Sequence, residues 1–212
     1  VALILVDSTG QNLISVASGA NFSLSPADVD AAAEEIKSAK MVVAQLESPL
    51  ETIARAAQIA KEAGVPVLLD PAPAPDGPLP AELMANVAVV KPNETEAERL
   101  TGIAVADAAS AEKAAEKLLE QGVETAIITL GASGSFVATR SGVRMVVPAR
   151  RVEAIDATAA GDAYSGALAV ALGEGKSLED AVVFATKTAA LSVRKLGAQP
   201  SLPTRAEIDA AE

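Results

Sequence analysis

Short runs of Val, Ile and Leu alternate along the chain with longer Ala-rich stretches in which apolar residues recur at helical spacing. The short runs predict buried strands, and the Ala-rich stretches predict helices with one apolar face. The predicted strands are 41–45, 65–69, 87–90, 125–130, 135–139 and 142–147. Strands that alternate with helices of about 10 to 15 residues predict an α/β fold, with a mostly parallel sheet and helices on both faces.

Capping residues indicate where the helices begin. Ser25 and Pro26 open the first, and Ser48 is expected to cap the second, with Pro49 at the first helical position and Glu51 completing a capping box. The later helices are expected from Asn93 to about Thr101, over 110–121, from the stretch 156–168 to about Leu172, from Ser177 to near Gly197, and after Thr204.

The chain opens with two β-type segments, 1–6 and 12–17, which flank a turn-like sequence at 7–11. This pattern predicts a hairpin. Residue 1 is Val and leads at once into the first of these segments, so we interpret the sequence as starting partway through a protein. No linker or repeat interrupts the rest, and we predict a single domain over residues 1–212.

Composition narrows the possible chemistry. The formal net charge of −11 argues against nucleic acid or an anionic membrane as the main partner, because both require a basic surface. No apolar run reaches the length of about 20 residues that a membrane helix needs. Cysteine and histidine are absent, which excludes disulfides, thiol nucleophiles and Ser-His-Asp triads. Carboxylates, Lys and Tyr remain for proton transfer, and a cytoplasmic location is compatible with this usage.

The stretch 156–168 carries the strongest candidate chemistry. Small residues lead into Asp162 and then into a helical pattern, so the backbone N–H groups of Ala160, Gly161 and Asp162 can form an anion hole beside a carboxylate. An ionised Asp in that position can accept a proton from an attacking hydroxyl, which predicts phosphate transfer. The alternative is an ordinary helix start packed against a sheet, and this stretch alone does not decide between them.

Other candidates follow predicted strands, where ligands of parallel sheets bind. Asn93 with Glu96 is either an ordinary capping box or a site for a nucleotide phosphate and hydrated Mg²⁺. Thr129 and Gly131 either line a nucleotide site or form the turn into the next strand. Glu47 either ends a buried strand or hydrogen-bonds a hydroxylated substrate. P-loop and dinucleotide-binding glycine motifs are absent.

Taken together, these segments resemble the ribokinase branch of the PfkB-type carbohydrate kinases. The matching segments are 19–21, 45–49, 70–74, 91–98, 129–131, 156–168 and 196–201, in the order of the family. The resemblance implies a three-layer αβα sandwich with a mostly parallel sheet, and a β-hairpin at 1–17 that is the remnant of a lid over the sugar. It also implies a homodimer paired through that lid.

The resemblance implies ATP-dependent phosphorylation of the terminal hydroxyl of a pentose such as D-ribose. Asp162 would take the proton, and the amides of Ala160 and Gly161 would hold the charge on the transferred group. The other implied roles are nucleotide binding for Asn93, Thr129, Gly131 and Gly161, Mg²⁺ binding through water for Glu96, sugar binding for Glu47 and Asp162, and binding of a monovalent cation such as K⁺ for Asp156, Thr158, Gly197 and Ser201.

One departure from the family pattern is large, because the N-terminal third, which carries sugar-binding residues, has no counterpart in this sequence. Two alternatives therefore stay open. One is a nucleoside, fructose or ketodeoxygluconate kinase of the same fold. The other is a truncated, split or engineered fragment that retains the nucleotide-binding part without turnover.

Overall fold

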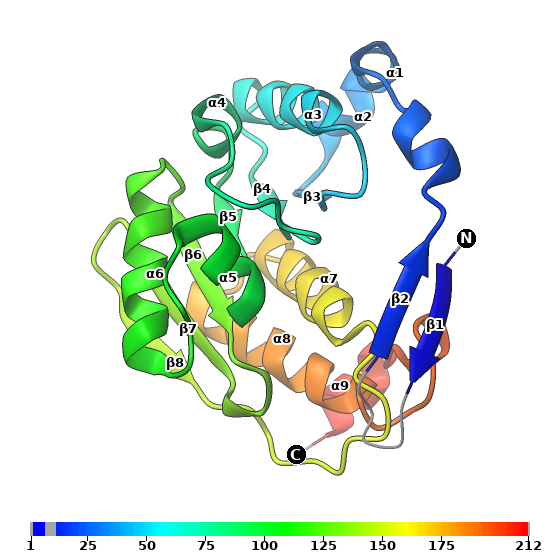
Figure 1. Cartoon of the computed structure of the whole chain (residues 1–212), viewed down its shortest axis with the longest axis vertical. Helices are drawn as coiled ribbons and strands as arrows, with labels where there is room; N and C mark the ends of the chain where they lie inside the picture. Colours follow the sequence, from blue (N-terminus) through cyan, green and yellow to red (C-terminus); the bar gives the residue numbers. More distant parts are fainter. Residues whose placement is uncertain (1, 7–11, 212) are drawn as a thin grey trace. The chain divides into compact units, whose positions relative to one another are not determined.

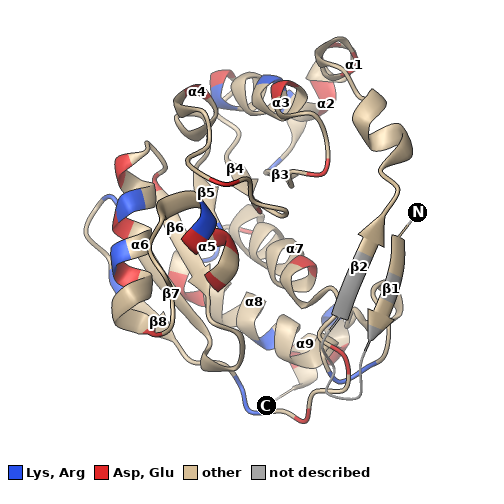
Figure 2. Cartoon of the chain, in the orientation of Figure 1, with Lys and Arg blue, Asp and Glu red and all other residues tan. Residues whose placement is uncertain are grey.

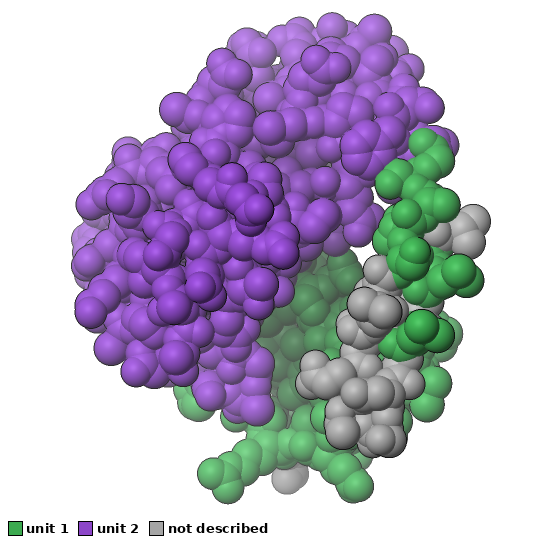
Figure 3. Space-filling model, in the orientation of Figure 1, with its two compact units in different colours: residues 1–19, 148–212 green, residues 20–147 purple. Residues whose placement is uncertain are grey.

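The computed structural model describes residues 2–6 and 12–211, and these form two compact units (Figure 3). We call residues 20–147 the sheet unit, and residues 1–19 together with 148–212 the helical unit.

The sheet unit contains a six-stranded sheet in the order β3-β4-β5-β6-β7-β8 (Figure 1). Its strands are β3 (Val42–Ala44), β4 (Val67–Leu69), β5 (Val89–Val90), β6 (Thr125–Thr129), β7 (Ser135–Thr139) and β8 (Arg144–Val147). The pairs from β3 to β6 are parallel, and β7 and β8 add antiparallel neighbours. The mostly parallel sheet predicted from the alternating pattern is confirmed. Its central strands are buried, as their unbroken apolar runs require.

Helices of the sheet unit supply the rest of its core. They are α1 (Pro26–Ala31), α2 (Ala33–Ser38), α3 (Leu50–Glu62), α4 (Ala81–Met84), α5 (Glu94–Thr101) and α6 (Ala108–Glu120), with short 3-10 turns at Gly19–Ser23 and Gly131–Ser133. Helix α6 buries Ala114 and Leu118 against β6 and β7, while charged residues follow its other face (Figure 2). Burying a side chain such as Leu118 contributes about 1.5 to 3 kcal/mol.

Two predicted helix features of the sheet unit are wrong. The single helix expected after Pro26 is broken at Ala32, which leaves the helical region, and each half packs on α3. Ala favours helix, so packing rather than local propensity causes the break. Ser48 does not cap α3, because the extended Pro49 is the N-cap and Ser48 lies one residue outside. Between the proline-rich segment 70–77 and β5 the structure also has α4, in a stretch for which no element was predicted.

The helical unit is built around α7 (Ala160–Gly173) and α8 (Leu178–Ser192), which pack against each other along their length. Helix α8 ends at Ser192, short of the predicted end near Gly197, and a 3-10 turn (Gln199–Ser201) and α9 (Arg205–Ala210) follow. The hairpin of β1 (Ala2–Val6) and β2 (Asn12–Val16) is confirmed, with Ala2 opposite Val16. Its predicted turn at 7–11 lies outside the described residues.

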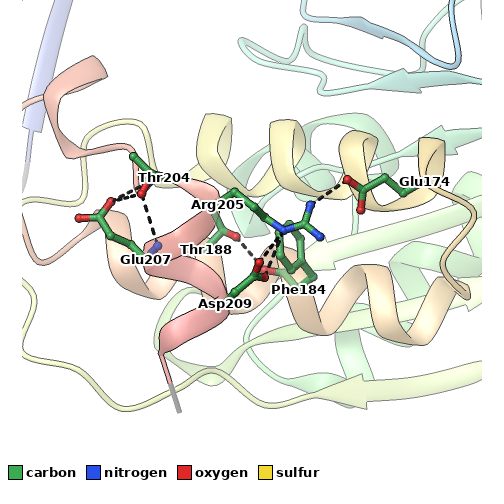
Figure 4. A network of polar contacts seen from close by, with 7 residues as sticks. All are labelled: Glu174, Phe184, Thr188, Thr204, Arg205, Glu207 and Asp209. Carbon is green, nitrogen blue, oxygen red and sulfur yellow. Dashed lines mark hydrogen bonds and ion pairs between the residues drawn. The ribbon is translucent and has the colours of Figure 1, made fainter.

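Polar contacts anchor α9 to α7 and α8 (Figure 4). The guanidinium of Arg205 donates to Glu174 at 2.8 Å and to Asp209 at 3.1 Å, and it lies 5.1 Å from the ring centre of Phe184. Thr204 and Glu207 form a capping box at the start of the helix, as Thr204 predicted. The Glu207 carboxylate also accepts a hydrogen bond from Lys195 at 2.9 Å.

These contacts predict a pH-dependent contribution to stability. The backbone N–H of Thr204, the Lys195 ammonium and the Thr204 hydroxyl lower the pKa of Glu207 from 4.5 to about 2. A carboxylate whose pKa falls on folding stabilises the protein above its unfolded pKa, and this contribution is lost as the pH falls. We therefore expect Glu207→Gln to lower the melting temperature at pH 7, and expect the difference from the parent chain to shrink between about pH 4.5 and pH 2.

Thermal unfolding followed across this pH range measures the difference. Glu35→Gln, which removes an exposed first-turn carboxylate of α2, is the control. A melting difference for Glu207→Gln that stays constant from pH 7 to pH 2 would contradict the assignment.

Candidate active site

In the sheet unit, polar residues collect where the parallel strands end. Asp70 follows β4 directly, Lys91 follows β5, and Asn93 lies two residues further on. The carboxyl ends of neighbouring parallel strands meet at one edge of a sheet, which is the usual ligand-binding edge of this architecture.

Asn93 and Glu96 form a reciprocal capping box at the start of α5. The Oδ1 of Asn93 accepts from the backbone N–H of Glu96 at 2.9 Å, and the Glu96 carboxylate accepts from the N–H of Asn93 at 2.8 Å. Burial raises the pKa of Glu96 and Asp70 adds to this rise, while the N–H of Asn93 and the charge of Lys91 oppose it. The capping role of both residues is thus visible in the structure, and their role toward a nucleotide or Mg²⁺ stays a prediction.

Thr129 lies beside Asn93. The two residues form a parallel β-bridge, and the N–H of Thr129 donates to the carbonyl of Pro92 at 3.0 Å. Gly131 follows at the start of a 3-10 turn with a φ of 48°, a left-handed conformation that suits glycine. Three of the four residues predicted for nucleotide binding are therefore close together at one strand end.

Glu47, predicted to bind sugar, is exposed in the loop after β3. Its role in sugar binding stays a prediction.

One feature of this strand end that was not predicted is a buried ion pair. Lys91 Nζ lies 2.7 Å from Asp70 Oδ2, and their side chains are only 3% and 6% exposed. Each residue directly follows a buried strand, and these strands are neighbours in the sheet. Opposite charges at matching ends of adjacent parallel strands are a pattern that could have revealed the pair in advance.

In the helical unit, α7 starts as the stretch 156–168 predicted. Ala160, Gly161 and Asp162 are its first three residues, and Asp162 is the acidic residue of the first turn. The preceding residue, Ala159, adopts a left-handed conformation with a φ of 61°, and among the described residues it is the only non-glycine residue with positive φ. The N-cap Ala159 makes no side-chain hydrogen bond to the first turn, and the N–H of Ala160 donates to the carbonyl of Ala157 at 3.2 Å. The start of a helix attracts anions through its dipole.

The left-handed conformation of Ala159 gives a stability prediction. An L-residue in this region is disfavoured by roughly 1 to 2 kcal/mol, a penalty that glycine does not have. We expect Ala159→Gly to raise the free energy of unfolding by about 1 kcal/mol, measured by denaturant unfolding. Ala169→Gly, in the middle of the same helix, should lower it by about 1 kcal/mol. If Ala159→Gly and Ala169→Gly lowered the free energy of unfolding equally, Ala159 would not be strained.

Three of the four residues predicted to bind a monovalent cation are joined by hydrogen bonds. Asp156 is buried, and its two carboxylate oxygens accept from the N–H groups of Thr158 at 2.9 Å and Gly197 at 2.8 Å. The Thr158 side chain and these N–H groups lower the pKa of Asp156. Ser201 is buried close by in sequence, with its hydroxyl donating to the carbonyl of Ala198 at 2.7 Å. The structure thus joins Asp156, Thr158 and Gly197 directly.

Two features are absent from the described part of the chain. Residues 2–6 and 12–211 contain no cluster of three or more acidic side chains arranged to hold a metal ion. Over the same ranges, no helix has the length and apolar character required to cross a bilayer.

Comparison with known proteins identifies the family. Residues 1–205 match the pfkB family carbohydrate kinase. The chain is 47% identical over 207 residues to the ribokinase of Haemophilus influenzae, covering 98% of this chain and 67% of the relative. It is 39% identical over 204 residues to the deoxyribokinase of Salmonella typhi, and the match covers 96% of this chain and 66% of that relative. The structure of Arabidopsis thaliana ribokinase complexed with ribose and ATP matches at 34% identity and a TM-score of 0.86. This match covers 98% of this chain and 67% of the Arabidopsis chain.

The chain therefore spans about two thirds of the length of these relatives. The TM-score confirms the predicted ribokinase-like fold, and the family match confirms the resemblance drawn from the motifs. This chain belongs to the pfkB family of carbohydrate kinases, which transfer phosphoryl groups.

Proposed function

We propose that this chain is the nucleotide-binding and catalytic part of an ATP-dependent kinase that phosphorylates the terminal hydroxyl of D-ribose. The observation that carries the proposal is Asp162 in the first turn of α7, behind a left-handed N-cap without a capping side chain. The 47% identity to a ribokinase and the relative solved with ribose and ATP support the choice of substrates.

In the proposed reaction, the Asp162 carboxylate accepts the proton of the sugar hydroxyl as its oxygen attacks the γ-phosphorus of ATP. The O–P bond to the sugar forms while the bond to ADP breaks. The amides of Ala160 and Gly161 then donate to the oxygens of the transferred group, where negative charge grows. Asp162 also orients the attacking hydroxyl by the same hydrogen bond, and Glu47 binds another hydroxyl of the sugar.

Asn93, Thr129 and Gly131 are proposed to bind the nucleotide, and Glu96 to bind Mg²⁺ through water. The donor set fits a hydrated Mg²⁺, because Glu96 is a part-buried carboxylate and Mg²⁺ needs only one or two carboxylates besides phosphate oxygens and water. When bound, Mg²⁺ would supply positive charge that neutralises the phosphates. Glu96 is fixed for this by the capping box, which leaves its second oxygen outside that hydrogen bond.

Asp156, Thr158, Gly197 and Ser201 are proposed to hold K⁺. The donors fit a hard cation, because they are carboxylate, hydroxyl and carbonyl oxygens without nitrogen or sulfur ligands. A cation here would supply charge that fixes the loop before α7, since Asp156 and Thr158 lie only a few residues before Ala160. We further propose that the β1–β2 hairpin pairs two copies of the protein. Its Leu3 and Leu5 side chains share one face of the hairpin and are exposed, as an apolar pairing surface requires.

The test is ADP formation by the 212-residue chain from MgATP with D-ribose, with and without K⁺, alongside calorimetric titration of MgATP. Ribose-dependent, K⁺-stimulated turnover is the expected result. A panel with 2-deoxy-D-ribose, fructose, ketodeoxygluconate and a nucleoside tests the sugar. MgATP binding without turnover would instead support a non-catalytic fragment, and loss of both turnover and MgATP binding would refute the proposal.

Glu96→Gln tests the magnesium role separately from folding. Glutamine at this position preserves the capping box, so α5 should start as before. We expect the Mg²⁺ concentration for half-maximal ATP binding to rise about tenfold, because the charge that attracts the hydrated ion is removed. An unchanged Mg²⁺ titration would return Glu96 to a purely structural role. Glu98→Gln, on an exposed position of the same helix, is the control.

A further inference from the structure

An open pocket in the helical unit has no role in the reaction described so far. Its volume is about 450 Å³, and it is lined by Arg151, Val152, Glu153, Ile155 and Arg194. All of these residues belong to the segment 148–212, so the pocket lies within one unit. Ligand pockets of proteins commonly have volumes of about 300 to 1,000 Å³, so this pocket is large enough for a small molecule.

Backbone hydrogen bonds hold the two sides of this pocket together. The N–H groups of Ile155 and Asp156 donate to the carbonyl of Val193 at 2.7 Å and 3.1 Å, and Arg194 is the next residue. Arg151 lies four residues before Ile155 on the other segment. The pocket is therefore formed by the segment that leads into Asp156 and the segment that follows α8, and the backbone fixes these two segments relative to each other.

The protein does not neutralise the two guanidinium groups of the pocket. Elsewhere, Arg55, Arg99 and Arg205 form ion pairs with carboxylates. Within residues 2–6 and 12–211, the side chains of Arg151 and Arg194 form no ion pair and no hydrogen bond. The chain has 28 acidic and 17 basic residues, so carboxylates are in excess, and two unpaired guanidinium groups in one pocket indicate an anionic ligand. Guanidinium suits phosphate, because its planar fork donates two parallel hydrogen bonds to phosphate oxygens.

The other lining residues indicate which phosphate compound fits. Glu153 also lines the pocket, and a carboxylate there repels a bare phosphate ion but accepts hydrogen bonds from hydroxyl groups. Val152 and Ile155 are 37% and 54% exposed, and they offer apolar surface to the carbon atoms of a ligand. This combination favours a phosphate monoester of a polyhydroxylated compound over inorganic phosphate.

We propose that this pocket is a second ligand site, in which Arg151 and Arg194 bind the phosphate of a sugar phosphate and Glu153 accepts a hydrogen bond from one of its hydroxyl groups. Neither Asp162 nor any residue proposed to bind the nucleotide lines it. A phosphate bound by both arginines links the segment before α7 to the segment after α8. Binding therefore stabilises the loop at Asp156, whose carboxylate joins the same two segments.

The test is calorimetric titration of the chain with D-ribose 5-phosphate and, separately, with inorganic phosphate, both without nucleotide. The parent chain should bind the sugar phosphate more tightly than inorganic phosphate. Arg151→Gln and Arg194→Gln should each weaken binding of the sugar phosphate about tenfold, the scale for losing a charge-assisted hydrogen bond. Arg150→Gln is the matched control, because it removes the same charge from an adjacent exposed residue that does not line the pocket. Its affinity should stay within about twofold of the parent value.

Glu153→Gln tests the selectivity of the pocket. Removing the negative charge should tighten binding of inorganic phosphate several-fold and so reduce the preference for the sugar phosphate. Hydrogen exchange at the amides of Ile155 and Asp156 should slow when D-ribose 5-phosphate is bound, and unchanged exchange would overturn the stabilising role.

D-ribose 5-phosphate is also the product of the proposed reaction, so binding at the active site has to be separated from binding at this pocket. Affinity that is lost in Arg151→Gln and Arg194→Gln but retained in Asp162→Asn belongs to the pocket. Circular dichroism shows which variants fold. Should a glutamine variant not fold, Arg151→Lys and Arg194→Lys decide, because they keep the charge but lose the planar fork and should still bind more weakly.

Several results would overturn the proposal. They are absence of sugar phosphate binding by the parent chain, tighter binding of inorganic phosphate than of the sugar phosphate, parent-like affinity in the folded arginine variants, and an equal loss in Arg150→Gln. The titration requires no nucleotide, so failure of the chain to bind MgATP would count against the proposed function and not against this pocket.

Discussion

Asp162→Asn is expected to lower sugar-dependent ADP formation by about 10²- to 10⁴-fold, the usual contribution of a positioned general base. Asn keeps nearly the same shape but accepts no proton at neutral pH. The backbone N–H groups of Ala160 and Gly161 are unchanged by the substitution, so the affinity for MgATP should change little. The loss should therefore appear in kcat, and a calorimetric titration of MgATP should show a parent-like dissociation constant.

A matched control separates proton transfer from the electrostatics of a helix start. Glu179 is an exposed acidic residue in the first turn of α8, in the same unit of the protein. Glu179→Gln removes a charge from the first turn of α8 and should leave turnover unchanged. If Asp162→Asn retained parent-like turnover, the base assignment would be wrong, and the α7 start would be only a structural feature.

The fold was predictable wherever local signals agree with packing. Thr204 caps α9 and Asn93 caps α5 as expected, because each side chain satisfies backbone groups within its own first turn. One of the two failures occurs where contacts distant in sequence decide. The break at Ala32 depends on α3. Ser48 was assigned as a cap because proline is common at the first helical position, whereas Pro49 is extended here and lies outside the helix.

The candidate site was likewise predictable only in part. Asp162 and its neighbours are contiguous, so the sequence alone places them together at a helix start. The bridge between Asn93 and Thr129 follows from two strand ends in one parallel sheet. The pairing of Lys91 with Asp70 and the bond from Gly197 to Asp156 join residues far apart in the chain. The first of these pairings could have been inferred from charges at the ends of neighbouring strands, whereas the bond from Gly197 to Asp156 is visible only in the folded structure.

The second large effect is expected at Asp156, whose carboxylate joins the loop before α7 to the segment after α8. Both of its oxygens accept backbone N–H groups, from Thr158 and from Gly197. An amide has one accepting oxygen and one donating NH₂ group. In Asp156→Asn, the NH₂ group must therefore face one of these N–H donors, and one hydrogen bond to a charged acceptor is replaced by a repulsive contact.

We expect Asp156→Asn to lower the free energy of unfolding by about 3 kcal/mol, the scale for losing charged hydrogen bonds at a buried site, and to abolish the proposed stabilisation by K⁺. Thermal unfolding in KCl and in choline chloride measures both. The folded pKa of Asp156 is lowered, so its contribution is present above the unfolded value of 3.8 and is lost as the pH falls further. The difference in free energy of unfolding between the parent chain and the variant should therefore disappear in acid.

Asp107→Asn is the control, because Asn caps α6 as well as Asp does. A parent-like melting temperature for Asp156→Asn would show that this carboxylate does not hold the loop, and a retained K⁺ response would place the cation elsewhere.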